Sequence, residues 1–109
     1  MLLVDDEPAL LAGMSDGLRA LDPSLEVLTA TSPEEALQII GQSPVNVVVT
    51  DLYMPGKDGF WLLLELQRRM PELPAIVCSS ALTPAACYRI ERAGGLECLH
   101  KPVRPRTLP

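Results

Sequence analysis

The feature that most constrains this chain is a short apolar run that ends in a carboxylate. Residues 45–51 read VNVVVTD and lie between Pro44 and Pro55. Consecutive valines are typical of a strand that is buried on both faces, as in a parallel sheet covered by helices. Ligands of such sheets bind beyond the carboxyl ends of the strands. Asp51 occupies such an end, although an aspartate there can also serve only to cap the next loop.

Strands and helices are expected to alternate along the whole chain. Four more short apolar runs predict strands at residues 1–4, 25–30, 75–78 and 96–100. Between the runs, apolar residues recur with the period of an amphipathic helix, near residues 8–21, 33–41, 60–70 and 84–93. This alternation predicts one α/β domain, a doubly wound parallel sheet with helices on both faces and right-handed crossovers.

Two of the helices allow more local predictions. Ser32 is expected to be the N-cap of the second helix, with Pro33 at the first helical position and Glu35 completing a capping box. In the third helix the residues expected to face the core are Phe60, Leu63 and Leu64.

The composition narrows the class of protein. The net charge of −5 argues against a nucleic-acid-binding surface, which needs clustered lysine and arginine. The three cysteines are spaced neither as metal ligands nor as disulfide pairs, which favours reduced thiols and a cytoplasmic location. Residues 1–7 are not expected to be a signal peptide, and no apolar run has the length of a membrane span.

Polar side chains stand at the carboxyl ends of four predicted strands. The first strand ends in Asp5 and Asp6, the third in Asp51, the fourth in Ser79 and the fifth in Lys101. Parallel strands share one carboxyl edge, so these five side chains are expected to converge. Three close carboxylates repel one another, which favours a hard cation with oxygen ligands such as Mg²⁺. With a lysine and a hydroxyl beside them they form a cradle for a phosphoryl group, and the central Asp51 is the candidate nucleophile.

This set of residues resembles the receiver domain of two-component response regulators, the CheY-like family. The resemblance covers nearly the whole chain and is carried by Asp5-Asp6, by residues 51–59 (DLYMPGKDG), by Ser79 and by Lys101-Pro102. It implies a flavodoxin-like (βα)5 three-layer sandwich with strand order 2-1-3-4-5. It also implies a phosphoacceptor in a phosphorelay, with a histidine kinase or histidine phosphotransfer protein as donor, rather than an enzyme that acts on other molecules.

The resemblance also implies a role for each residue of the acceptor site. Asp51 is the phosphoacceptor and a metal ligand, and Lys101 contacts the phosphoryl oxygens. Asp6 binds Mg²⁺ directly, while Asp5 holds a metal-bound water or shares the ligation. Tyr53 offers its backbone carbonyl to the metal.

The conformational switch departs from the family pattern at one position. Ser79 matches the switch hydroxyl, with Ser80 ranked second. Family members usually carry a tyrosine or phenylalanine three residues before the lysine. This chain has Cys98 there, which leaves open how the aromatic half of the switch operates.

The segment after Lys101 predicts an incomplete domain. Residues 103–109 contain only two apolar side chains and two prolines, so the fifth helix is expected to be missing or truncated. Residues 1–109 are therefore expected to be a single receiver domain that continues into an output or kinase region, as in the receivers of hybrid sensor kinases. An exposed apolar patch is expected beside the fifth strand, unless self-association covers it.

Two other functions fit part of the pattern. A haloacid-dehalogenase-like phosphatase also uses an aspartate nucleophile, a lysine and Mg²⁺, but it needs a second aspartate where this chain has Tyr53. The second alternative is a receiver-like interaction module that works by contact alone and never accepts phosphate.

Overall fold

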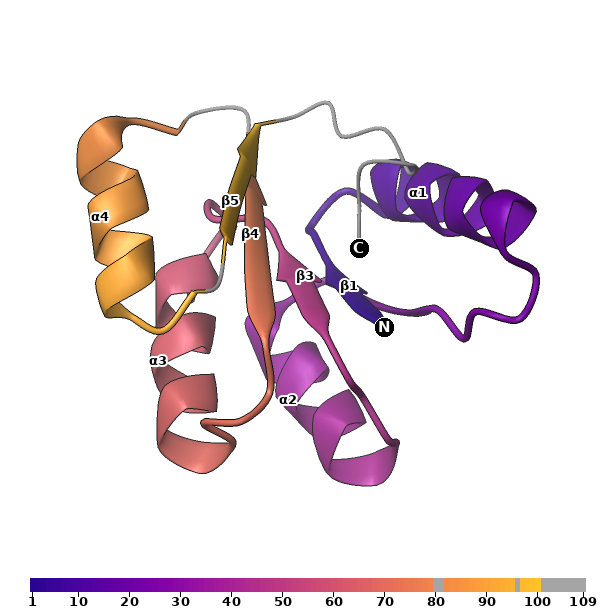
Figure 1. The fold of residues 1–109 in the computed structure, drawn as a ribbon, viewed down its shortest axis with the longest axis horizontal. Helices are drawn as coiled ribbons and strands as arrows, with labels where there is room; N and C mark the ends of the chain where they lie inside the picture. The colour runs from indigo at the N-terminus through magenta and orange to yellow at the C-terminus, as the bar shows by residue number, and fades with distance from the viewer. Residues whose placement is uncertain (80–81, 96, 101–109) are drawn as a thin grey trace.

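The structure, a computed structural model, describes residues 1–79, 82–95 and 97–100. Over these residues five strands alternate with four helices, as predicted (Figure 1). The strands are β1 (Leu2–Val4), β2 (Leu28–Ala30), β3 (Val48–Thr50), β4 (Ala75–Ser79) and β5 (Glu97–His100). The helices are α1 (Pro8–Leu21), α2 (Pro33–Gln42), α3 (Gly59–Arg69) and α4 (Pro84–Arg92). No helix in this part of the chain has the length and hydropathy needed to cross a membrane.

All the strands run parallel, in the order β2-β1-β3-β4-β5, which confirms the predicted order. Leu2 pairs with both Leu28 and Val48. Strands β2 and β3 both begin later than predicted, and each pairs with the three residues of β1. The strand order reverses between β1 and β3, the place where ligands bind in open α/β sheets.

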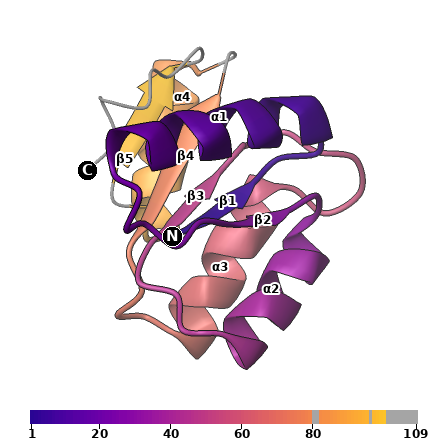
Figure 2. The ribbon, with the colours of Figure 1, turned by 90° about the vertical axis from the view of Figure 1, so that its right-hand side faces the viewer.

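Helices cover both faces of the sheet. Helix α1 lies on one face, and α2, α3 and α4 lie on the other (Figures 1 and 2). Successive side chains of each strand point to opposite faces, so Leu2 and Val4 join the core under α2–α4 while Leu3 joins the core under α1. This double burial is why β1, β3 and β4 are buried at every position and mostly apolar rather than alternating.

Helix α3 turns a different face to the core than predicted. Phe60 and Leu63 are buried, as expected, but Leu64 is 58% exposed. The core positions are completed by Leu62 and Leu66 instead. Residues three and four apart share one face of a helix, and in a run of three leucines that spacing fits more than one choice of face.

Helix α2 begins as predicted, with one difference in its cap. The Ser32 side chain accepts a hydrogen bond from the Glu35 backbone N–H at 3.1 Å, and Pro33 is the first helical residue. The Glu35 carboxylate reaches one residue further than in a capping box. It accepts from the backbone N–H of Thr31 at 3.3 Å rather than from that of Ser32.

An apolar patch exposed to solvent was expected beside the fifth strand. For β4, the strand next to β5, this expectation is wrong. Ile76 and Cys78 point toward the α1 face, and both are buried, at 1% and 3% exposed. They belong to the same cluster as Leu11 and Leu18 of α1. The predicted absence or truncation of a fifth helix concerns residues 101–109, which lie outside the described residues.

Candidate functional site

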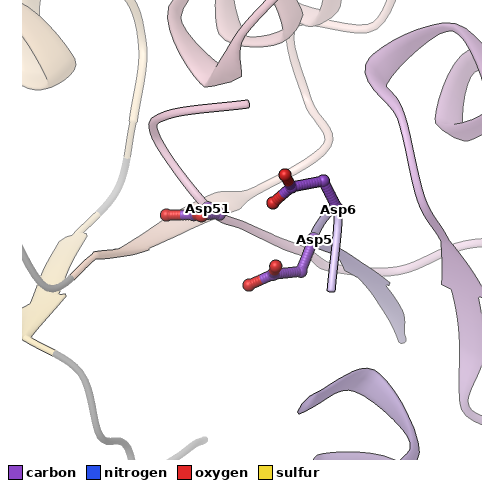
Figure 3. A group of neighbouring side chains, drawn as sticks. All are labelled: Asp5, Asp6 and Asp51. Atoms are coloured by element: carbon purple, nitrogen blue, oxygen red, sulfur yellow. The ribbon is translucent and has the colours of Figure 1, made fainter. Parts of the chain in front are cut away.

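Three of the five predicted site residues converge at the carboxyl edge of the sheet. Asp5 and Asp6 follow β1, and Asp51 follows β3. One carboxylate oxygen from each residue lies within 4.8 Å of the other two. Figure 3 shows the three side chains projecting toward the same space. Asp5 is buried, Asp6 is exposed and Asp51 is half-buried, so the cluster opens to solvent on one side.

The sheet itself brings these residues together. The backbone N–H of Asp51 donates to the carbonyl of Val4 at 2.9 Å, and the N–H of Asp5 donates to the carbonyl of Ala30 at 3.1 Å. These bonds continue the ladders beyond the ends of β1 and β3. Both carboxylates are therefore anchored by backbone that cannot shift without breaking sheet hydrogen bonds.

Backbone amides also orient two of the carboxylates. The N–H of Glu7 donates to Oδ1 of Asp5 at 3.0 Å, and the N–H of Leu52 donates to Oδ1 of Asp51 at 2.8 Å. Hydrogen bonds to a charged acceptor are stronger than neutral ones. Sequence reasoning missed both donors, because every residue except proline carries a backbone N–H and side-chain identity does not mark these two.

The loop after Asp51 is held close to the sheet by Gly59. The Gly59 N–H donates to the carbonyl of Leu52 at 2.8 Å. A Cβ at position 59 would overlap the carbonyl oxygen of Asp51 and approach Cα of Leu52 to 2.9 Å. Asp58 caps α3 by accepting from the N–H of Trp61 at 3.1 Å. A glycine next to the start of a predicted helix is the sequence signal that could have revealed this contact. A close approach of two backbone segments is one reason for a glycine at such a position.

The carboxylate cluster fits a small divalent cation. Two oxygens bound to one Mg²⁺ are at most about 4.2 Å apart, since each Mg–O distance is about 2.1 Å. The observed spacing of 4.8 Å or less is close to that limit, so small side-chain adjustments suffice. Mg²⁺ usually keeps several waters and binds only one or two carboxylates together with phosphate oxygens. The exposed side at Asp6 leaves room for such ligands.

The other predicted residues are only partly placed. Ser79 is the last residue of β4 and is buried. It stands two residues beyond Val77, the partner of Thr50, and therefore at the same edge as Asp51. The Tyr53 side chain is 50% exposed, and its role through the backbone carbonyl stays a prediction. Lys101 and Ser80 lie outside the described residues.

The residue that replaces the expected aromatic is also placed. Cys98 lies on β5, is half-buried and packs against the core cluster under α2, α3 and α4. Its register partner is Val77 of β4. The position is therefore occupied by a small side chain in contact with the core.

The family model described as "Response regulator receiver domain" matches residues 1–109 of this chain. The chain belongs to that family. Receiver domains of this family are signalling phosphoacceptors that generally bind Mg²⁺ at an acidic cluster. Family membership, together with the acidic pair directly after β1, decides against the phosphatase alternative.

Individual proteins of the family are similar over most of this receiver. It is 34% identical over 103 residues to the transcriptional regulatory protein GlrR of Escherichia coli strain K12, which covers 94% of this chain and 23% of GlrR. A receiver domain crystal structure from Clostridium thermocellum is 31% identical, with a TM-score of 0.85, covering 96% of this chain and 83% of that chain. A CheY-like receiver from Methanospirillum hungatei is 26% identical, with a TM-score of 0.88, covering 97% and 83%. The chain thus spans under a quarter of the length of GlrR.

Proposed function

We propose that this receiver accepts a phosphoryl group on Asp51 from a phosphohistidine, with Mg²⁺ held by the carboxylates of Asp5, Asp6 and Asp51. The observation that carries the proposal is the convergence of these three carboxylates within 4.8 Å at the strand ends. Membership of the receiver family supports it. We propose no activity toward a separate substrate, because the acceptor is a residue of the chain itself.

The reaction moves a phosphoryl group from nitrogen to oxygen. A carboxylate oxygen of Asp51 attacks phosphorus as the bond from phosphorus to the histidine nitrogen breaks, and that nitrogen keeps the electron pair. The product is an acyl phosphate on residue 51. The Leu52 amide holds Oδ1 of Asp51 at 2.8 Å, which fixes the orientation of the carboxylate before the donor arrives.

Charge compensation is the second requirement, because the phosphoryl group adds negative charge beside three carboxylates. Mg²⁺, when bound, supplies positive charge to the phosphoryl oxygens. We assign Asp6 to direct ligation, Asp5 to ligation or to holding a metal-bound water, and the Tyr53 carbonyl to a further ligand position. We assign Lys101 to contact with the phosphoryl oxygens.

The response to phosphorylation is assigned to Ser79, which would hydrogen-bond the phosphoryl group. Ser79 is buried at the end of β4, one strand away from Asp51. Because Cys98 is small and half-buried, we propose that this receiver responds without the inward movement of a large ring on β5.

The partners follow from the chemistry of the donor. We propose a histidine kinase or a histidine phosphotransfer protein as phosphoryl donor, in the cytoplasm. We further propose that the receiver controls an output or kinase region of a longer protein, which agrees with the greater length of GlrR, a transcriptional regulatory protein.

One experiment separates phosphoryl acceptance from function by contact alone. The chain is incubated with Mg²⁺ and phosphoramidate, a small donor with a phosphorus–nitrogen bond, and its intact mass is measured over time. The proposal predicts a single phosphoryl adduct that requires Mg²⁺ and forms equally in the control Asp16→Asn, which alters an exposed carboxylate on α1. A chain that binds Mg²⁺ and gains no mass would support the contact-only module instead.

A further inference from the structure

A groove of about 340 Å³ runs between α3 and α4, which lie side by side on the same face of the sheet (Figure 1). None of the three site carboxylates lines it. Its lining residues come from the two helices and the turn after α4, and they are Phe60, Leu64, Tyr88, Arg89, Arg92 and Ala93.

The groove concentrates apolar surface that the fold leaves open. Leu64 is 58% exposed and Tyr88 is 61% exposed. They are two of the five large apolar side chains that are exposed among the described residues, and both line this groove. The other three are Leu21, Tyr53 and Met70, which do not line it. Exposed apolar residues scattered singly are ordinary, whereas these two lie together in one groove.

Two arginines form a cationic border on the same groove. Cζ of Arg89 lies 3.9 Å from the centre of the Phe60 ring, and Cζ of Arg92 lies 5.9 Å from that of Tyr88. Among the described residues neither arginine forms an ion pair, whereas Arg68 and Arg69 of α3 both pair with Glu65.

Glu91, the acidic residue of α4, lies away from Arg89 and forms no ion pair with Arg92 among the described residues. Glu91 follows Arg89 by two residues, which turns it about 200° around the helix, to the opposite side. The chain as a whole carries a net charge of −5, so the positive groove stands out against an acidic molecule.

We propose that the α3–α4 groove is a docking site for an acidic amphipathic helix of a partner protein. The apolar stripe of such a helix would cover Leu64 and Tyr88, and carboxylates beside the stripe would pair with Arg89 and Arg92. Helices commonly bind grooves in this way, through anchors spaced at i, i+3, i+4 and i+7. Stacking on the rings orients the guanidinium groups before binding, which lowers the ordering cost.

A second copy of this chain is a poorer occupant. In a two-fold dimer built on this groove the same patch meets itself, so the positive borders of both copies would share one interface. Like charges held together across an interface oppose association. The groove therefore favours a partner of opposite charge.

The test uses a designed peptide of about 15 residues, with leucines at the anchor spacing and glutamates on both sides of them. The wild-type chain and an Asp51→Asn variant are each titrated with it, followed by calorimetry and by amide chemical shifts. We expect saturable binding in both chains, shifts centred on α3 and α4, and weaker binding at higher salt. Absence of shifts at peptide concentrations up to about 1 mM would overturn the proposal.

Paired variants test the apolar and charged parts separately. Leu64→Ser should weaken binding by roughly tenfold or more, whereas Leu21→Ser, which alters an equally exposed leucine on α1, should not. Arg92→Glu should reject the glutamate peptide and bind a peptide in which lysines replace the glutamates. Arg68→Glu makes the same charge change outside the groove and should leave the peptide preference unchanged. Equal binding of both peptides by the wild type would overturn the proposal, as would self-association of the wild type that Leu64→Ser abolishes.

Discussion

The backbone of Gly59 lies directly against the carbonyl oxygen of Asp51, with no room for a Cβ atom between them. The contact closes the loop between β3 and α3, and the Gly59 N–H completes it by donating to the Leu52 carbonyl. The same loop supplies the Leu52 amide that holds the Asp51 carboxylate. The first residue of α3 and the proposed acceptor are therefore mechanically linked.

Replacing Gly59 with alanine tests this link. The added methyl group must displace the backbone of residues 51 and 52, so Gly59→Ala should destabilise the fold by about 1–3 kcal/mol. It should also slow phosphorylation by roughly tenfold or more, because the acceptor carboxylate moves. The matched control is Gly13→Ala in α1, where a Cβ would meet nothing within 4 Å. This substitution should stabilise the fold by about 0.5–1 kcal/mol. Normal stability and phosphorylation in Gly59→Ala would show that the contact is not restrictive. Denaturant unfolding and the rate of mass gain provide the two measurements.

Removing one carboxylate tests the metal site. Removing a residue that only hydrogen-bonds a metal ligand lowers metal affinity by about 10–100-fold. Because Asp6 is assigned as a direct ligand, Asp6→Asn should weaken Mg²⁺ binding by at least about tenfold. Without metal, the same variant should be more stable by roughly 0.5–1 kcal/mol, because it relieves repulsion among three carboxylates. Calorimetric titration with Mg²⁺ measures the first effect and denaturant unfolding the second. Asp16→Asn serves as control for both, and equal Mg²⁺ affinity in the two variants would remove Asp6 from the site.

The hydroxyl of Ser79 is expected to matter after phosphorylation rather than before it. Ser79→Ala should accept phosphate at a rate within a few-fold of wild type, because residue 79 is neither nucleophile nor metal ligand in this account. The chemical-shift changes that accompany phosphorylation should shrink, above all along β4 and α4. A full set of changes in Ser79→Ala would move the switch role to Ser80.

An ion-pair cluster on α3 predicts a pH dependence of stability. The hydrogen bond from Arg68, helped by the charges of Arg68 and Arg69, lowers the pKa of Glu65 below its ordinary value of 4.5, against an opposing effect of desolvation. A folded-state pKa below the unfolded one stabilises the protein above the unfolded pKa, and this contribution is lost as pH falls through the folded pKa. The thermal midpoint of wild type should therefore exceed that of Glu65→Gln slightly near pH 7. The gap should close as the pH falls through the lowered pKa of Glu65, and it should shrink in high salt. A gap that persists at the lowest pH would mean that charge is not its cause.

Much of the fold was predictable because local signals and global pattern agree. Ser32 and Pro33 begin α2 where the capping pattern places them, and the apolar run before Asp51 is a central strand. The convergence of Asp5, Asp6 and Asp51 was predictable for a related reason. Once strands are parallel, residues that follow them must meet at one edge.

What the sequence could not show depends on contacts between distant segments. Periodicity did not decide whether Leu62 or Leu64 faces the core, since that choice depends on how α3 sits on the sheet. The need for glycine at position 59 arises only when the loop folds back on residue 51. The α3–α4 groove exists because Leu64 was left outside, next to Tyr88 of a helix 24 residues away in the chain.

The most direct test of this account is to locate the phosphoryl group. The chain is phosphorylated with phosphoramidate and Mg²⁺, the acyl phosphate is reduced with borohydride, and the modified residue is identified by peptide mass spectrometry. Reduction of an aspartyl phosphate yields homoserine, so homoserine is expected at position 51 in wild type and not in Asp51→Asn. Homoserine at another position, or an Asp51→Asn variant that gains phosphate with the same yield, would contradict it.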